Sequence, residues 1–381
     1  MTTKKEKNDT TTARRAMSQL SIPRTPAVGL DLGEEFSVAT MYSVLGEISE
    51  RFNFSMDDAG YALFSSRIPK DARIGYEAST MAYPVNRRLR AMGYQNITVA
   101  HPKELALIVR SKKKNDRADS EKIARLLFMD MLPESHLLTR EEQIVRDLLL
   151  QRVKLGVEIA RTKSSVISYL KREDVYATLP KANNNFSAAR REAIRSIRFG
   201  DDRDLVLKTM MEKVAFYEER CAPLEERTKA LVKDNEDVKL LMTIPGVDYY
   251  LASLFSSYVR DVNRFPTVDH LASFFGIIPE TRDSANVKRR GRMSKDGPSI
   301  ARWTLGIMTD TVMHWNPHLH RYYVHQKERT KSGKRAHVLA MKKLLRMTYH
   351  VLKTREHWRW ENEALTNKKL EGLERGGGGV A

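Results

Sequence analysis

The stretch Val28-Gly-Leu-Asp-Leu-Gly33 ends a short apolar run on a carboxylate and then turns at a glycine. Runs of four to nine apolar residues bounded by turn residues are typical of buried β-strands. Four runs of this kind span Ala27 to Leu32, Phe36 to Val44, Arg73 to Tyr76 and Ile97 to Ala100. A helix-like stretch, Ser79 to Met92, lies between the last two. Strands that alternate with helices predict an α/β layer whose sheet is at least partly parallel.

The amino-acid composition of the chain indicates which classes of binding partner to expect. The chain has 381 residues, and its 66 Lys and Arg against 48 Asp and Glu leave a net charge of +18. A basic excess of this size attracts polyanions, of which nucleic acid is the commonest in a cell. The single Cys221 excludes an intrachain disulfide framework and a Cys-rich metal site. With no long apolar segment and no apolar signal stretch, the sequence predicts a soluble, unprocessed, cytoplasmic protein without a membrane partner.

The chain divides by composition and periodicity into five predicted segments. The two ends, 1–23 and 359–381, are expected to be a disordered basic tail and a flexible tail. Between them we predict an α/β domain over 24–135, a helical coiled-coil connector over 136–240 and a mostly α-helical basic domain over 241–358.

The connector is predicted from two apolar stripes. One runs through Thr139 to Leu170. The other advances by alternating steps of three and four residues, the spacing of a coiled-coil seam, through Leu207, Met210, Val214, Tyr217, Cys221, Leu224, Thr228 and Leu231. Two long helices are therefore expected to pair, within one chain or between chains, and Pro223 is expected to kink or interrupt the second helix.

Four carboxylates stand apart from the solvated majority. Asp31 and Glu77 each end an apolar strand, where a lone charge is costly without a partner. Asp116 and Asp119 are three residues apart at an expected helix start, so they share one helical face. Converging carboxylates are what a Mg²⁺ site for phosphoryl transfer needs. The alternative is that Asp116 is a helix cap and Asp119 an ordinary surface charge.

The C-terminal half is basic. Val287 to Lys295 holds five Lys and Arg in nine positions, and Arg321 to Arg359 mixes further cations with aromatic residues, a composition suited to phosphate contacts and base stacking. Upstream, the Pro-Gly turn in Ile244-Pro-Gly-Val247 resembles the turn of helix-hairpin-helix modules, which faces phosphate. The alternatives are a solvated basic face and an ordinary turn between helices.

Taken in order, these motifs resemble the Asp-Glu-Asp-Asp transposases of the IS110 class of insertion sequences, which act as bridge-RNA-guided recombinases. The resemblance spans nearly the whole chain. Its N-terminal part rests on Gly29-Leu-Asp31, Glu77 and Lys114-Asn-Asp-Arg-Ala-Asp119. Its C-terminal part rests on Ile244-Pro-Gly-Val247, Arg264-Phe265, Gly276-Ile-Ile-Pro279, Ser284-Ala285 and Ser294-Lys-Asp-Gly297.

The resemblance implies a RuvC-like domain of the ribonuclease-H fold, a catalytic serine at Ser284, and Mg²⁺ held by Asp31, Glu77, Asp116 and Asp119. It implies donor and target DNA and an element-encoded guide RNA as partners, a homo-oligomer (a dimer, or a tetramer on synapsed DNA) with a composite site, and a bacterial or archaeal, nucleoid-associated protein. Nucleic-acid contacts are expected from Lys113, Lys114, Arg117, Arg282, Lys288, Arg289, Arg290, Arg292, Lys295 and Arg302.

The sequence departs from the family pattern at three places. Ala285 follows Ser284 where a glycine is usual, Asp248 replaces the second hairpin glycine, and Pro298 replaces an asparagine. These departures leave Ser294 as a rival nucleophile. Two other functions stay open: a RuvC-like junction nuclease that activates water, and a non-catalytic nucleic-acid-binding protein.

Overall fold

The computed structural model describes residues 25–108, 116–284 and 287–375, and for 116–117, 280–284 and 287–292 it describes the backbone alone. The predicted tail over 1–23 and the predicted contacts of Lys113 and Lys114 lie outside these residues. The chain forms two compact units, Met1–Leu138 and Thr139–Ala381. Each has its own core, and each is described by itself below.

The N-terminal unit is built on a five-stranded mixed sheet. Its elements, in chain order, are β1 (Ala27–Asp31), β2 (Phe36–Tyr42), β3 (Ile48–Ser55), α2 (Asp58–Arg67), β4 (Arg73–Glu77), α3 (Ala82–Ala91), β5 (Ile97–Ala100), α4 (Pro102–Ile108) and α5 (Asp116–Phe128). The strand order is β3-β2-β1-β4-β5. The first three strands pair antiparallel, whereas β1 with β4 and β4 with β5 pair parallel.

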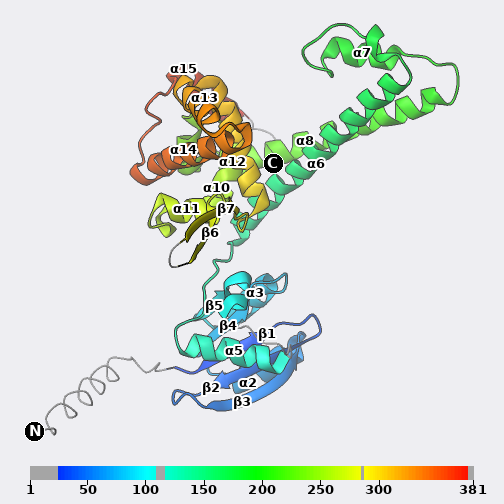
Figure 1. Cartoon of the computed structure of the whole chain (residues 1–381). Helices are drawn as coiled ribbons and strands as arrows, with labels where there is room; N and C mark the ends of the chain where they lie inside the picture. Colours follow the sequence, from blue (N-terminus) through cyan, green and yellow to red (C-terminus); the bar gives the residue numbers. More distant parts are fainter. Residues whose placement is uncertain (1–24, 109–115, 285–286, 376–381) are drawn as a thin grey trace, which may run out of the picture. The chain divides into compact units, whose positions relative to one another are not determined.

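Helices cover both faces of this sheet (Figure 1). On one face, side chains of α2 and α3 such as Phe64 and Leu89 pack with Leu30 and Tyr76 of the strands. On the other face lies α5. The predicted α/β class, the four predicted strands and the helix after β4 are confirmed, and the arrangement is consistent with a RuvC-like fold. The sequence analysis missed β3, an edge strand with few buried residues.

The C-terminal unit is mostly helical. Its elements are α6 (Arg140–Arg172), η1 (Tyr176–Thr178), α7 (Ala188–Ser196), α8 (Arg203–Val232), α9 (Glu236–Met242), α10 (Tyr249–Val259), η2 (Val262–Arg264), α11 (Val268–Phe274), β6 (Pro279–Ser284), β7 (Val287–Met293), α12 (Ser299–Trp315), α13 (Pro317–Thr330), α14 (Gly333–Thr354) and α15 (Glu363–Arg375). Strands β6 and β7 form a two-stranded antiparallel hairpin.

Helices α6 and α8 run side by side within one chain, with α7 at the far end of the pair (Figure 1). The predicted pairing of two long helices is therefore present within the chain. A coiled coil between chains stays a prediction. Helix α8 continues through Pro223, so the predicted interruption is wrong. Proline removes one backbone hydrogen bond of the helix, yet α8 runs on to Val232 despite this loss.

The apolar stripes are only partly those predicted. Four residues of the predicted stripe in α8 are buried as expected: Leu207, Val214, Cys221 and Thr228. Near the two ends of the helix, however, the buried residues are Met211 and Val232 instead of the predicted Met210 and Leu231. Leu231 is 39% exposed. Met211 and Val232 each follow a buried residue of the stripe by four positions, a spacing that keeps them on the same helical face.

The C-terminal residues correct another prediction. Residues 359–381 were expected to be a flexible tail, yet Glu363–Arg375 form α15, in which Thr366 and Leu373 are buried. Ends of the long helices α6 and α8 contribute Leu149, Val153 and Val232 to the same core as the following helices. The described helices include none that combines the length and apolar character needed to cross a membrane.

Candidate active site

The N-terminal site is organised by the close approach of α5 to β1. A Cβ atom on Gly29 would lie 2.1 Å from the backbone oxygen of Ser120 and 2.3 Å from the backbone nitrogen of Ala124, so only glycine allows this contact. The buried hydroxyl groups of Thr40 and Ser120, 2.8 Å apart, hydrogen-bond and fix the helix over the sheet. The glycine before the predicted carboxylate of β1 is thus required by the packing of α5.

Asp31 and Glu77 lie on the face of the sheet that α5 covers. A Cβ on Gly75 would meet Ile123 and Leu127 of α5, so Gly75, like Gly29, faces this helix. Successive residues of a strand alternate between faces. Asp31 and Glu77, each two residues further on, therefore belong to the same face. The parallel register pairs Leu30 with Tyr76, which makes Asp31 and Glu77 the next residues on neighbouring strands.

Helix α5 begins near the same end of the sheet. Its residue Leu127 packs with Ala27 at the start of β1, whereas Ser120 approaches Gly29. The first turn of α5 therefore points toward the end of β1 that carries Asp31. Asp119 lies in this turn, is half-buried and accepts a hydrogen bond from Lys122 Nζ at 2.7 Å. The backbone places Asp116 three residues earlier; its side chain and that of Arg117 lie outside the described residues.

A metal site needs several ligand side chains close together. Among the described side chains, no three His, Cys, Asp or Glu residues are grouped closely enough to hold a metal ion. Asp31, Glu77 and Asp119 thus share one face and one end of the sheet without forming a complete ligand set. The set that the sequence predicts includes Asp116, whose side chain is not among those described, and all four donors are carboxylate oxygens of the type Mg²⁺ prefers.

The predicted nucleophile lies in the other unit, on a hairpin that the sequence analysis did not predict. Ser284 is the last residue of β6 and pairs with Val287, the first residue of β7. It therefore stands at the tip of the hairpin. The rival Ser294 follows β7 at the base, where its backbone N–H donates to the carbonyl of Ile278. At about 3.3 Å per residue the two serines are roughly 20 Å apart.

The predicted nucleic-acid contacts divide into two groups. The side chains of Arg282, Lys288, Arg289, Arg290 and Arg292, like that of Ser284, lie outside the described residues, although the hairpin places their backbone on β6 and β7. Lys295 is exposed just beyond β7. Arg302, in α12, donates from Nη1 to the carbonyls of Phe275 and Gly297, at 3.2 and 3.3 Å, and so braces the base of the hairpin.

The Pro-Gly turn between α9 and α10 has internal partners. Asp248 caps α10 by accepting from the backbone N–H of Leu251 at 2.9 Å, which puts a negative charge where a phosphate would bind. Lys369 of α15 donates to the turn carbonyls of Met242, Ile244 and Val247. Burial lowers the pKa of Lys369 to about 8, against the opposing effects of Asp248 and Glu361. These contacts give the turn a structural role, the docking of α15.

Sequence reasoning missed Lys369, because its partners are backbone oxygens more than a hundred residues away. It also passed over Trp303, a large aromatic residue that is 44% exposed on α12. The sequence does contain a signal for this residue: Trp303 directly follows Arg302 in a basic domain.

Comparison with known proteins shows which family the chain resembles. A model described as "Transposase IS116/IS110/IS902 family" matches residues 238–324, which include Ser284 and Ser294. A second model, of the Asp-Glu-Asp-Asp transposases of IS110, matches residues 28–173, which include all four predicted carboxylates. Together the two models cover more than half of the chain.

Individual relatives agree with the family models. The transposase of insertion sequence IS1533 from Leptospira borgpetersenii is 24% identical over 61% of this chain and 69% of its own length. The putative transposase y4qE from Sinorhizobium fredii is 25% identical over 74% of this chain and 68% of its own. The transposase of IS1111A from Coxiella burnetii is 26% identical over 54% and 56%. The chain belongs to the IS110 family of DNA transposases.

Proposed function

We propose that this transposase cuts and rejoins donor and target DNA through a covalent phosphoserine at Ser284, assisted by Mg²⁺ at Asp31, Glu77, Asp116 and Asp119, with its sites chosen by a guide RNA. The observation that carries the proposal is the placement of Asp31 and Glu77 on neighbouring parallel strands, on the face covered by the helix that carries Asp116 and Asp119. Glu77 is exposed and Asp31 is half-buried at this end of the sheet, so an ion can reach both carboxylates.

The hairpin supports Ser284 over Ser294. A tip residue can reach into a DNA groove, whereas Ser294 lies next to the backbone contacts that anchor the hairpin. The register pairs Arg282 with Arg289 and Ser284 with Val287, so the two arginine positions lie close to Ser284 along the hairpin. Cations at these positions would balance the charge on the attacked phosphate.

The chemistry conserves the number of phosphate ester bonds. Ser284 Oγ gives up its proton, forms a bond to phosphorus, and displaces a deoxyribose oxygen, which takes up a proton. The reverse steps, with a different DNA end as the attacking alcohol, restore the phosphodiester without ATP.

Mg²⁺, when bound, would polarise the phosphate and stabilise the charge that develops on it. The residues of the chain hold the ion and position the DNA. Asp119 is already paired with Lys122, so binding of the ion at Asp119 requires that this side chain be shared or released. The proposed contacts to nucleic acid come from the basic positions of α5 and of the hairpin, with Lys113 and Lys114 preceding α5.

Guide-RNA pairing and a homo-oligomer on synapsed DNA belong to the same proposal. Delegating sequence choice to base pairing fits a basic protein that contacts mostly backbone phosphates. A predominance of such contacts predicts binding that weakens steeply with salt.

Trapping tests the proposal. The protein is incubated with Mg²⁺, RNA transcribed from the flanks of its element and labelled DNA, then denatured, and any protein–DNA adduct is mapped by peptide mass spectrometry. We expect an adduct on Ser284 that is abolished in Ser284→Ala and in Asp31→Ala. The matched control is Ser294→Ala, which should retain the adduct.

Two results would overturn the covalent route. Mg²⁺-dependent cleavage with no adduct, retained in Ser284→Ala, would identify a junction nuclease that activates water. An adduct abolished by Ser294→Ala but not by Ser284→Ala would move the nucleophile to the base of the hairpin.

A further inference from the structure

A second feature of the C-terminal unit lies beside the base of the β6–β7 hairpin. A shallow cavity of about 600 Å³, wide open to solvent, lies between α12 and α14, and Met293, the last residue of β7, is part of its lining. Its lining is mainly apolar, with Ile307, Val338 and Met341 among the residues that form it. A space of this size easily admits a flat heteroaromatic ring.

One wall of the cavity is the indole of Trp303, which is 44% exposed. An exposed aromatic face in a basic surface is a platform on which unpaired bases stack. The opposite helix contributes His337, whose Nε2 lies 2.8 Å from Asp310 Oδ1. This pair holds the imidazole in one orientation and leaves Nδ1 as the ring nitrogen able to hydrogen-bond to a ligand.

The charges around the cavity favour an anionic ligand. Helix α14 carries six Lys and Arg residues and neither Asp nor Glu. Two cations line the cavity: Lys334, which is exposed, and Arg302, whose Nη1 donates to the backbone carbonyls of Phe275 and Gly297. The one acidic residue of the lining is Asp310, which is bonded to His337. An apolar slot with an aromatic wall and cations at its edge matches a base attached to phosphates on both sides.

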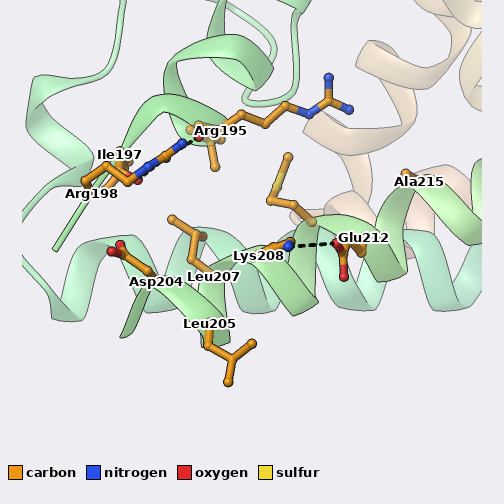
Figure 2. A pocket seen from close by; sticks show the side chains of 11 residues that line it. Arg195, Ile197, Arg198, Asp204, Leu205, Leu207, Lys208, Glu212 and Ala215 are labelled. Atoms are coloured by element: carbon orange, nitrogen blue, oxygen red, sulfur yellow. Dashed lines mark hydrogen bonds and ion pairs between the residues drawn. The ribbon is translucent and has the colours of Figure 1, made fainter. Parts of the chain in front are cut away.

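A second cavity, between α7 and α8, differs in its lining from the cavity that contains Trp303 (Figure 2). It measures about 480 Å³ and contains no aromatic residue. Arg198 donates to the carbonyls of Arg195 and Ile197, and Lys208 lies 3.9 Å from Glu212. That cavity therefore offers no surface on which a base could stack.

We infer that the Trp303 cavity binds one unpaired nucleobase of a strand that runs along α14 past the base of the hairpin. This inference rests on the proposed handling of nucleic acid, and it adds a base-stacking site that the strand-exchange chemistry does not use. The base comes from RNA or from melted DNA, which share the chemistry that the cavity recognises. The site explains why an exposed tryptophan is placed among cations.

Binding of single-stranded probes tests the inference. The full-length protein is titrated in EDTA with a DNA or RNA oligonucleotide that carries 2-aminopurine, and with a blunt duplex of the same sequence. Trp303→Leu should weaken binding of the unpaired probes about tenfold, the effect of losing one stacked base, and change duplex binding less than about twofold. Trp303→Phe, which keeps an aromatic face, should retain most of the affinity.

Two further variants separate stacking from general damage. Gly306→Leu should fill the cavity without removing a charge, because a Cβ at this position meets only His337, at 3.8 Å, and should weaken binding as Trp303→Leu does. Trp315→Leu removes a tryptophan that is 58% exposed at the other end of α12 and outside the cavity, and should have no effect. Photocrosslinking from 5-iodouracil in the probe should map to Trp303.

The inference is overturned if Trp303→Leu weakens duplex and single strands equally, if Trp315→Leu causes the same loss, or if crosslinks map elsewhere. A tighter RNA probe assigns the base to the guide, and a tighter DNA probe assigns it to the melted element. Because the titration is done in EDTA and no strand is cut, failure here is distinguishable from failure of the phosphoserine route.

Discussion

Gly29 shows how one residue connects the fold to the site. The missing side chain lets the backbone of α5 lie directly on β1, and this contact brings the start of α5 toward the end of β1 that carries Asp31. The sequence predicted Asp31, Glu77 and the helix start near Asp116, because each ends or begins an apolar pattern. It could not predict that Gly29 and Gly75 face one helix, since this depends on pairing between strands distant in the chain.

Gly29→Ala should therefore destabilise the N-terminal unit by about 3 kcal/mol, since the new Cβ would overlap backbone atoms that cannot move aside. Urea unfolding followed by circular dichroism measures the change. The matched control is Gly372→Ala in α15, where a Cβ would meet nothing within 4 Å and alanine is the better helix former. Equal stability of Gly29→Ala and the wild type would show that α5 does not pack as described.

Elements differ in how far the sequence predicts them. Long helices such as α6 carry their own signals, including the capping box of Thr139 and Glu142. The β6–β7 hairpin and α15 carry weak ones: the hairpin is mostly polar and charged, and α15 is held by the contact of Lys369 with a distant turn. The sequence motifs therefore predict Ser284 as a candidate nucleophile, but they do not predict its position at a hairpin tip.

The α6–α8 pair is fastened to α7 by Glu218. This carboxylate accepts hydrogen bonds from Arg191 at 2.6 and 2.8 Å and pairs with Lys163 at 2.6 Å. The Arg191 hydrogen bonds, together with Lys163, lower the pKa of Glu218 to about 2, against the effect of burial. A carboxyl group with a lowered pKa in the folded state stabilises that state above its unfolded pKa, and the stabilisation is lost as the pH falls toward the folded value.

Glu218→Gln should consequently cost about 1 kcal/mol near neutral pH, a figure reduced for the solvent screening of a partly exposed pair. The difference from the wild type should shrink as the pH falls from about 4.5 toward 2, the interval between the two pKa values. Urea midpoints at several pH values measure it. Glu212→Gln, whose partner Lys208 is 3.9 Å away on the surface, is the control and should change little. A pH-independent difference would contradict the role given to the ionised carboxylate.

At the scale of the whole molecule, the predicted catalytic residues are divided between the two compact units. The carboxylates belong to the unit that ends at Leu138, and Ser284 belongs to the unit that begins at Thr139. The first unit buries its own core of strand and helix side chains, and the second buries another. The sequence predicts a domain boundary after residue 135, and the two compact units divide after Leu138. The sequence also predicts a connector separate from the following domain, whereas α6 and α8 share a core with the later helices.

Units with separate cores are expected to unfold separately. Differential scanning calorimetry should thus resolve two transitions in the free protein. Gly29→Ala should lower the temperature of one, and a cavity-forming substitution in the other core, Leu344→Ala, should lower the other, because Leu344 is fully buried in the C-terminal unit. A single transition that both variants shift together would show that the units fold as one. Two independent transitions would mean that the predicted carboxylates and the predicted serine are carried by separately stable bodies, each with its own core.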